Sequence, residues 1–395
     1  MAQKMSYMIA GAAGFAGLSW WWQRTTSVPP RTAYHCAAER DPSTFLTNRT
    51  HMLGFFTSDI EKKKKNNNNN NIARPSSPPL RPLTTKQEEE TAENVRVLQW
   101  NVNVLMGKSG RDPVQPKDIA KFILETKPDV VLLQEAGKQR FQEDLASGYS
   151  TYYQQTVARL NGRVAKLQSL LREAGYTVVV DDNDSSENPA LLASRLDVVD
   201  KGESFSIDEK KYADATKGDS RSGRFVRVAL RGGSGDHQLG FLVTHLHHTE
   251  RGESRGVRRW EVTTLLRKWR ENASKVGATL LGSDLNYPRQ CDHSPREWAV
   301  VRAGYEQLGE PTEGDGVAEL LTDADFRCAY DISLDGAGTP SFTHWTGTTV
   351  DFAWLHCRDE ARWEVLRSEA LPTQLSDHLP VVTDLRFKCQ RSEST

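Results

Sequence analysis

The sequence predicts an α/β domain with β-sheets inside and helices outside, and three observations support this. Strand-like and helix-like segments alternate over residues 92–390. No second linker interrupts this region, and no fixed-period repeat appears in it. Hydrophobic residues make up 37% and charged residues 26% of the 395-residue chain, an ordinary balance for a globular protein. A single domain over residues 92–390 is therefore expected.

The expected strands are apolar runs. Residues 128–135, PDVVLLQE, begin at a proline and are almost continuously apolar, as expected of a strand buried on both faces. Residues 217–223 are expected to form a polar loop, and residues 287–343 loops and short elements. The other expected strands are 95–105, 176–180, 188–199, 224–230, 239–246, 278–286, 348–356 and 379–387.

Three segments have the period of helices. Residues 117–127 place Ile119, Phe122 and Ile123 on one face. Residues 151–176 form a longer pattern that ends at Gly175, a residue typical of helix C-termini. Residues 256–273 form the third expected helix, so helices fall between the strands along the chain.

The N-terminal region differs in composition from the domain. Residues 1–23 contain an uncharged stretch from Met5 to Trp22, which suits a secretory signal, a short membrane anchor or a mitochondrial presequence. Membrane-anchored, secretory and organellar locations all stay open. Residues 24–91 contain a Lys run, six consecutive Asn and a Pro/Ser-rich segment, which predicts a disordered low-complexity linker.

Charge and cysteine content argue against several classes of protein. Residues 92–395 carry 39 Lys and Arg against 45 Asp and Glu, so no global basic field favours nucleic-acid binding. Five scattered Cys argue against a disulfide scaffold and against a CxxC-type zinc site. An acidic compact enzyme can use its carboxylates to hold a divalent cation.

Polar residues follow the apolar strands, where α/β sheets gather a site. They include three Asp, one Glu, two Asn and two His, without a nucleophile elbow or a glycine-rich phosphate loop. Oxygen ligands of this kind suit Mg²⁺ or Mn²⁺, and an Asp and a His could serve water activation and charge stabilisation in phosphate-ester hydrolysis. These residues are Asn101, Glu135, His245, Asp284, Asn286, Asp351, Asp377 and His378.

Six short motifs in order resemble the endonuclease/exonuclease/phosphatase superfamily, which includes DNase I. They are WNVN at 100–103, QE at 134–135, THLHH at 244–248, SDLN at 283–286, VDF at 350–352 and SDHLPV at 376–381. The resemblance covers residues 92 to about 388. It implies a DNase I-like four-layered α/β sandwich, with two mixed β-sheets packed face to face and helices outside.

The resemblance also implies a role for each residue. Glu135 would be the principal metal ligand, with Asn101 assisting and Asp377 facing the metal. Asp284 would activate the water, and Asn286 would hold the scissile phosphate. His245 would donate to a phosphate oxygen, and Asp351 would orient His378.

Some features match the family loosely. Asn103 stands where some members have Asp. Three residues, Arg255, Arg258 and Glu261, lie near where the family often has an Arg and a Gln. A cluster of arginines is either a solvated sheet face or a clamp on substrate phosphate. Its members are Arg221, Arg224, Arg227 and Arg231.

Three functions stay open from the sequence. The favoured one is a Mg²⁺- or Mn²⁺-dependent phosphodiesterase or nuclease acting on nucleic acid. The second is a lipid phosphatase or phospholipase C-like enzyme acting on a phosphoinositide or sphingomyelin-type headgroup, which membrane association through residues 5–22 would favour. No Trp-x-Asp-Arg-Ile signature of the 5-phosphatases follows near Asp351, however. The third is a catalytically inactive binding module, against which the intact Glu135, Asp284 and His378 argue. The oligomeric state is unknown.

Overall fold

The computed structural model describes most of the C-terminal three quarters of the chain. The apolar segment 5–22 and the low-complexity residues 24–91 lie outside the described residues, so their predicted roles stay predictions. No helix among the described residues is long and apolar enough to span a membrane. The described residues are 92–108, 113–136, 151–180, 190–202, 204–207, 221–230, 238–248, 256–308, 316–336, 338–340, 342–345, 347–359 and 362–388.

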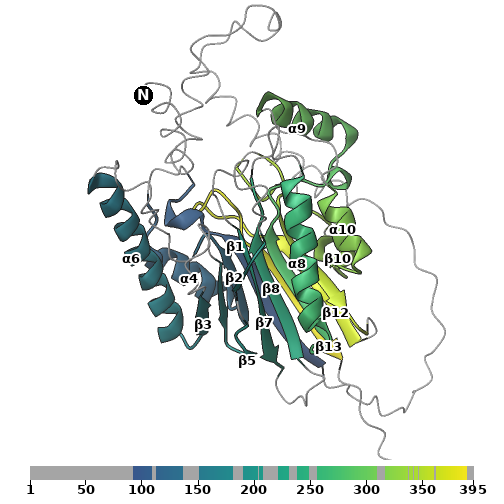
Figure 1. The fold of residues 1–395 in the computed structure, drawn as a ribbon, viewed down its shortest axis with the longest axis horizontal. Helices are drawn as coiled ribbons and strands as arrows, with labels where there is room; N and C mark the ends of the chain where they lie inside the picture. The colour runs from purple at the N-terminus through teal and green to yellow at the C-terminus, as the bar shows by residue number, and fades with distance from the viewer. Residues whose placement is uncertain are drawn as a thin grey trace, which may run out of the picture. The chain divides into compact units, whose positions relative to one another are not determined.

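Two mixed β-sheets form the centre of this region (Figure 1). The first sheet has the strand order β12 (Trp363–Ala370), β13 (Val381–Lys388), β1 (Ala92–Asn101), β2 (Val130–Gln134), β4 (Leu191–Ser194) and β3 (Thr177–Val180). The second sheet has the order β10 (Arg327–Cys328), β11 (Asp351–Cys357), β9 (Ala278–Asp284), β8 (Gln238–His245), β7 (Ser222–Ala229) and β5 (Asp197–Asp200), and β6 (Ser204–Ser206) pairs with β7.

Helices cover the outer face of each sheet. On the first sheet lie α4 (Pro116–Thr126) and α6 (Thr151–Glu173), and on the second lie α8 (Val257–Ala273) and α10 (Val317–Asp323). The remaining elements are η1 (Asn103–Leu105), η5 (Gln290–Asp292), α9 (Pro295–Leu308) and α11 (Ala329–Ile332). The predicted four-layered sandwich is confirmed.

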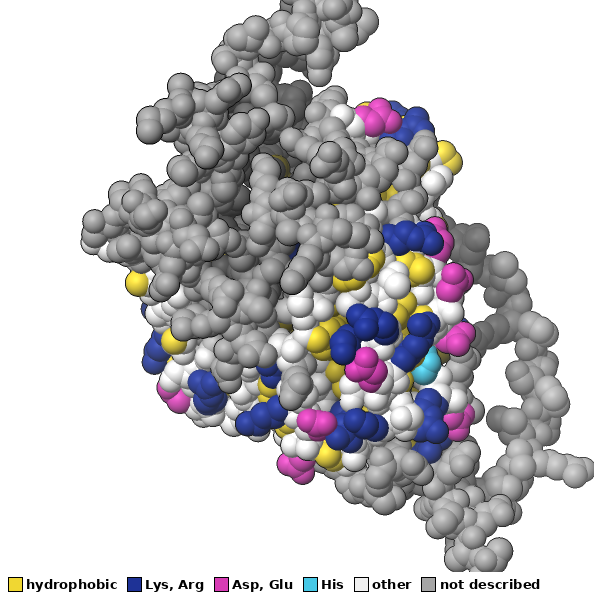
Figure 2. All heavy atoms as spheres, in the orientation of Figure 1, with side chains coloured by type: hydrophobic (Ala, Val, Ile, Leu, Met, Phe, Trp, Pro, Cys, Tyr) yellow, Lys and Arg dark blue, Asp and Glu magenta, His cyan; other side chains and the backbone are white. Residues whose placement is uncertain are grey.

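Three apolar clusters hold the four layers together. The central one lies between the sheets and joins Val97 and Leu132 of the first sheet to Phe241 and Leu280 of the second. The two outer clusters pack helices onto sheets, as Trp269 of α8 does. The opposite side of α8 is charged, and Figure 2 shows basic and acidic side chains interspersed over this face of the domain. Burial of this apolar surface is the main force that stabilises such a sandwich.

Strand direction brings the polar residues to one end of the sandwich. β1 and β2 are parallel neighbours in the first sheet, and β8 and β9 are parallel neighbours in the second. The carboxyl ends of each pair therefore meet at one edge. β13 runs antiparallel to β1, and β11 runs antiparallel to β9, so the residues that precede or begin these strands reach the same edge.

Several expected element boundaries were wrong. The segment 188–199 is two strands in different sheets, because the chain turns at Arg195 and Leu196. β1 ends at Asn101 rather than at 105, and β7 begins at Ser222, inside the expected polar loop. β12 was missed, and α9 is a 14-residue helix in a region expected to hold loops and short elements. β12 lies at a sheet edge and alternates buried with half-exposed residues, so its apolar signal is weak.

Gly282 of β9 allows the two sheets to approach each other. A Cβ atom at this position would lie 2.5 Å from Cδ1 of Leu132 and 3.2 Å from Cγ of Gln99, both in the opposite sheet. We expect Gly282→Ala to lower the free energy of unfolding by about 1–3 kcal/mol, because overpacking forces the sheets apart. Urea unfolding measures this change.

The control is Gly304→Ala in α9, where an added Cβ would meet no atom within 4 Å. It should leave stability unchanged or raise it slightly, because alanine favours the helix over glycine. Equal stability of Gly282→Ala and the wild type would contradict the close sheet contact.

Candidate active site

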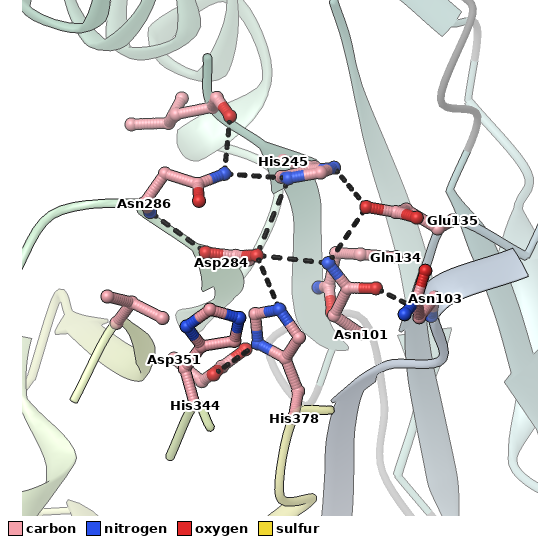
Figure 3. Close-up of polar contacts among 12 residues, drawn as sticks. Asn101, Asn103, Gln134, Glu135, His245, Asp284, Asn286, His344, Asp351 and His378 are labelled. Carbon is pink, nitrogen blue, oxygen red and sulfur yellow. Dashed lines mark hydrogen bonds and ion pairs between the residues drawn. The ribbon is translucent and has the colours of Figure 1, made fainter. Parts of the chain in front are cut away.

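The strand register places the candidate residues next to one another. Asp284, the last residue of β9, is the register partner of both His245 at the end of β8 and Asp351 at the start of β11. In the first sheet, Asn101 at the end of β1 pairs with Gln134 at the end of β2. Figure 3 shows these side chains converging from both sheets. The structure thus brings together residues far apart in the sequence, such as Gln99 and Asp351, which are 252 positions apart.

The carboxylate of Asp284 lies at the centre of the group. Its Oδ2 accepts a hydrogen bond from Nδ2 of Asn101 at 3.0 Å, and its Oδ1 accepts one from the backbone N–H of Asn286 at 2.8 Å. Burial, opposed by His378, raises the pKa of this carboxyl to about 6. Asp284 is therefore mostly ionised at pH 7 and suited to accept a proton.

Glu135 and Asp377 form an acidic pair beside this centre. Burial is the main cause that raises the pKa of Glu135 to about 7, and the nearby charge of Asp377 adds to it. Burial also raises the pKa of Asp377. Two carboxylates that are costly to ionise together, both offering oxygen, fit a divalent cation, because the cation would remove that cost.

Asn101 connects the acidic pair to Asp284. Its Nδ2 donates to Oε1 of Glu135 at 3.2 Å as well as to Asp284, while its Oδ1 accepts from the backbone N–H of Asn103 at 2.9 Å. The amide group therefore orients both carboxylates in this arrangement. That Asn101 also assists a metal stays a prediction.

His378 and Asp351 form a buried ion pair. Nδ1 of His378 lies 2.8 Å from Oδ2 of Asp351, and its Nε2 lies 3.7 Å from Oδ2 of Asp284. Burial opposes the charged imidazole, but the carboxylates of Asp351 and Asp284 outweigh it and hold the pKa of His378 well above its ordinary value. The imidazolium thus directs Nε2–H toward the centre of the site.

His245 and Asn286 form the opposite side of the site. Nε2 of His245 lies 2.8 Å from Nδ2 of Asn286 and 3.4 Å from Oδ2 of Asp284. Burial first, and the charge of Arg221 second, hold the pKa of His245 well below its ordinary value, so this imidazole is neutral. Asn286 (φ 50°) and Glu135 (φ 55°) both have left-handed backbone conformations, a strain that is common in active sites.

Helix α8 supports Asn286 from behind. Arg258 of this helix is fully buried, and its Nη1 donates to the carbonyls of Asn286 and His247 at 3.2 and 3.3 Å. The carboxylate of Glu261, also fully buried, accepts from the backbone N–H of His247 at 2.9 Å. The sequence matched this pair only loosely to the family, but both residues hold the backbone around the site.

Sequence reasoning missed several contributors. Gln99 and Gln134 lie between the sheets, and Nε2 of Gln99 donates to Oδ1 of Asp351 at 3.3 Å. His344 packs its ring 4.4 Å from that of His378, and its Nε2 lies 3.9 Å from Oδ2 of Asp377. The alternation of Gln99 with Asn101 on one strand face was a usable signal, whereas nothing in the sequence connected His344 to His378.

The described members of the arginine cluster have different partners. Arg224 donates to the carbonyls of Lys201 and Gly202, and Arg227 pairs with Asp200 at 2.8 Å. Arg231 lies outside the described residues. Only Arg221, among the members that the structure describes, reaches the candidate site.

Among the described residues, two groups of His and Asp are close enough together to hold a metal ion. His344, Asp377 and His378 form one, and Asp284, Asp351 and His378 form the other, with ligand atoms within 4.8 Å of one another. Both groups need His378 as a ligand. Its Nδ1 already contacts Asp351, and its imidazole is protonated, so it would have to lose a proton before it could bind a metal. The pair of Glu135 and Asp377 fits a cation better for this reason.

Comparisons with known proteins agree with this geometry. Residues 98–378 match the model of the Endonuclease/Exonuclease/phosphatase family. An endonuclease/exonuclease/phosphatase from Beutenbergia cavernae is similar in structure, with 17% identity, a TM-score of 0.53, and coverage of 75% of this chain and 72% of that chain. No curated protein matches the chain in sequence.

Two further solved structures are similar at lower scores. The human Nocturnin catalytic domain with bound sulfate has 19% identity and a TM-score of 0.47, covering 75% of this chain and 94% of that chain. A mannosyl-6-phosphatase from Bacteroides thetaiotaomicron has 15% identity and a TM-score of 0.45, covering 74% and 99%.

Binding of a divalent cation at Glu135 should release a proton. The pKa of about 7 means that this carboxyl is mostly protonated at lower pH, and a cation must displace that proton. Titration calorimetry with Mg²⁺ or Mn²⁺ in buffers of different ionisation enthalpy should show release of roughly one proton at about pH 6 and almost none at about pH 8.

The affinity for the cation should therefore rise with pH and level off above the pKa of Glu135. Glu135→Gln, which cannot ionise, serves as the matched control and should lose the proton release. Release that is the same at both pH values, or that survives in the control, would place the cation elsewhere.

Proposed function

Since this chain belongs to the endonuclease/exonuclease/phosphatase family, a family of phosphate-ester hydrolases, we propose that it is a divalent-metal-dependent phosphodiesterase acting on nucleic acid. The reaction is hydrolysis by a water molecule that Asp284 activates. The observation that carries the proposal is the position of Asp284, a buried carboxylate between two amide donors and two imidazoles.

Asp284 is the proposed general base. Its hydrogen bonds from Asn101 and Asn286 fix the carboxylate without protonating it. The pKa of about 6 lies close to neutral pH, where a base combines sufficient ionisation with a useful affinity for protons. The proton of the attacking water would pass to Asp284.

Asn286 and His245 are the proposed phosphate-binding groups. Their side-chain nitrogens lie 2.8 Å apart and offer N–H donors to one region of the site. An oxygen of the scissile phosphate would accept from both. The backbone of Asn286 is held from below by Arg258, so this donor is already oriented before substrate binds.

His378 is the proposed stabiliser of developing negative charge. The ion pair with Asp351 keeps the imidazole protonated and fixes the direction of its Nε2–H. A fixed cationic donor in a buried site stabilises charge that grows in the transition state more than a mobile one in water does.

Glu135 and Asp377 are the proposed ligands of Mg²⁺ or Mn²⁺. A cation held there would polarise the phosphate and lower the pKa of the attacking water. The two carboxylates supply the hard oxygen donors that either ion prefers. Their elevated pKa values fit this assignment, because burial makes both carboxylates costly to ionise and a bound cation would offset that cost.

A substrate panel tests the class of substrate. We expect the protein with Mg²⁺ or Mn²⁺ to cleave single- or double-stranded DNA or RNA and to leave phosphoinositide and sphingomyelin headgroups intact. Initial rates with each substrate and cation, at equal concentrations, measure the preference. Cleavage of lipid headgroups alone would replace the nuclease by a lipid phosphatase or phospholipase C-like enzyme. No turnover of any diester, bis-p-nitrophenyl phosphate included, would favour a binding module.

Two substitutions test the mechanism. Asp284→Asn removes the base, and His378→Ala removes the cationic donor, so each should lower turnover of bis-p-nitrophenyl phosphate by roughly 10²–10⁴-fold. Thermal unfolding checks that both variants remain folded. Asp323→Asn, which changes an exposed carboxylate at the end of α10, should retain the wild-type rate. A near-normal rate in either active-site variant would remove that residue from the mechanism.

A further inference from the structure

Arg221 is a buried cation directly beside the candidate active site. It precedes β7 and is 2% exposed. Its backbone carbonyl accepts from the N–H of Ile207 at 3.1 Å, which fixes the main chain at this point. Its Nη1 lies 3.2 Å from Nδ1 of His245, at the end of the neighbouring strand β8. A guanidinium buried this deeply needs polar partners, because burial of an unpaired charge is costly.

The contact between Arg221 and His245 determines which nitrogen of the imidazole carries the proton. A guanidinium nitrogen donates hydrogen bonds and accepts none, and it stays protonated in proteins. Nδ1 of His245 must therefore be the acceptor. A neutral imidazole has one donor and one acceptor, so its proton is on Nε2. That nitrogen faces Asp284 and Asn286, on the reacting side.

The other contacts of His245 favour the opposite arrangement. Oε1 of Glu135 lies 3.7 Å from Nδ1 and would attract a proton there. Nδ2 of Asn286 lies 2.8 Å from Nε2 and could donate to it if that nitrogen had no proton. In that arrangement Nε2 of His245 would accept a hydrogen bond from Asn286, and the proton on Nδ1 would face the Glu135 carboxylate. Arg221 is the contact that excludes it.

We propose that Arg221 is a positioning residue, which holds the proton of His245 on Nε2 and so keeps both His245 and Asn286 as donors toward an anionic oxygen. With Nε2 protonated, two N–H groups face each other 2.8 Å apart, and Asn286 keeps its second hydrogen bond to the carbonyl of Leu246 at 2.9 Å. An anionic oxygen that accepts from both N–H groups would remove the repulsion between these two donors. The ligand class is a phosphate ester, so the inference rests on the proposed function.

A double-mutant cycle tests whether Arg221 acts through His245. Arg221→Met should lower kcat/KM for bis-p-nitrophenyl phosphate with Mn²⁺ by about 10- to 100-fold, the usual range for loss of a charged hydrogen bond. The double variant Arg221→Met/His245→Gln should be no slower than His245→Gln alone. Effects that multiply would overturn the inference, because Arg221 would then act independently of His245.

Two further variants separate the hydrogen bond from the charge. Arg221→Gln keeps an N–H donor without the charge and should recover part of the rate lost in Arg221→Met. Arg227→Met, on the strand that follows Arg221 but paired with Asp200, is the matched control and should keep the wild-type rate. A rate for Arg221→Gln equal to that of Arg221→Met would show that a neutral donor does not replace the guanidinium and would overturn the tautomer role.

A spectroscopic measurement tests the inference without turnover. Imidazole ¹⁵N–¹H correlation spectra distinguish the two tautomers, and the signal that is lost in His245→Gln identifies His245. The wild type should show the proton on Nε2, and Arg221→Gln should keep it there while Arg221→Met does not. A wild-type proton on Nδ1 would overturn the inference.

If the wild type hydrolyses no diester, the proposed function fails, but these spectra still decide the role of Arg221. If Arg221→Met does not fold, the wild-type spectrum still decides, because a proton on Nδ1 would contradict donation from Arg221.

Discussion

The site depends on one constraint, the burial of the Asp284 carboxylate at the edge where the two sheets meet. An isolated buried carboxylate would take up a proton, because burial disfavours its charge. Here the amide of Asn101 and the backbone N–H of Asn286 donate to it, and the His378 imidazolium lies close by. These partners come from three different strand ends. The polar network is stable only if β1, β9 and β13 end or begin at the same place.

Charge is distributed unevenly across the site. On one side, Glu135 and Asp377 are acidic and hard to ionise together. Around Asp284, Arg221 and His378 are cations: the neutral His245 lies between Arg221 and Asp284, whereas Nε2 of His378 lies 3.7 Å from Asp284 itself. A divalent cation would offset the charge of Glu135 and Asp377, and a phosphate oxygen would accept from the N–H donors of His245 and Asn286. Burial lowers the pKa of both histidines, but the carboxylates of Asp351 and Asp284 outweigh burial at His378, whereas the charge of Arg221 adds to it at His245.

The two sheets make this arrangement rigid. Gly282 lets them approach closely directly beside Asp284, and the two glutamines Gln99 and Gln134 fill the space between the sheets with hydrogen-bonding groups. Close packing of this kind transmits small displacements, so a change between the sheets moves the catalytic strand ends. The helices on the outer faces contribute as well, because Arg258 of α8 reaches the backbone of Asn286.

The sequence by itself determined the fold class and the set of candidate residues. Long apolar runs such as β2, β8 and β9 are evident because strands buried on both faces need apolar side chains throughout. The polar residues after them stand out for the same reason. Edge strand β12 was not evident, because a half-exposed strand carries a mixture of polar and apolar side chains. The break between β4 and β5 was not evident either, because no local pattern shows which sheet a strand joins.

Only the tertiary structure decided what each side chain does. The family resemblance implied different roles for His245 and His378 but not their protonation, and the sequence showed Arg221 only as one arginine of a cluster. Their protonation and roles follow from contacts across the sheets, with Asp351 for His378 and with Arg221 for His245. Such contacts depend on register and on burial, which arise when distant strands pair and water is excluded. The residue types are therefore local information, whereas their electrostatics belong to the folded molecule.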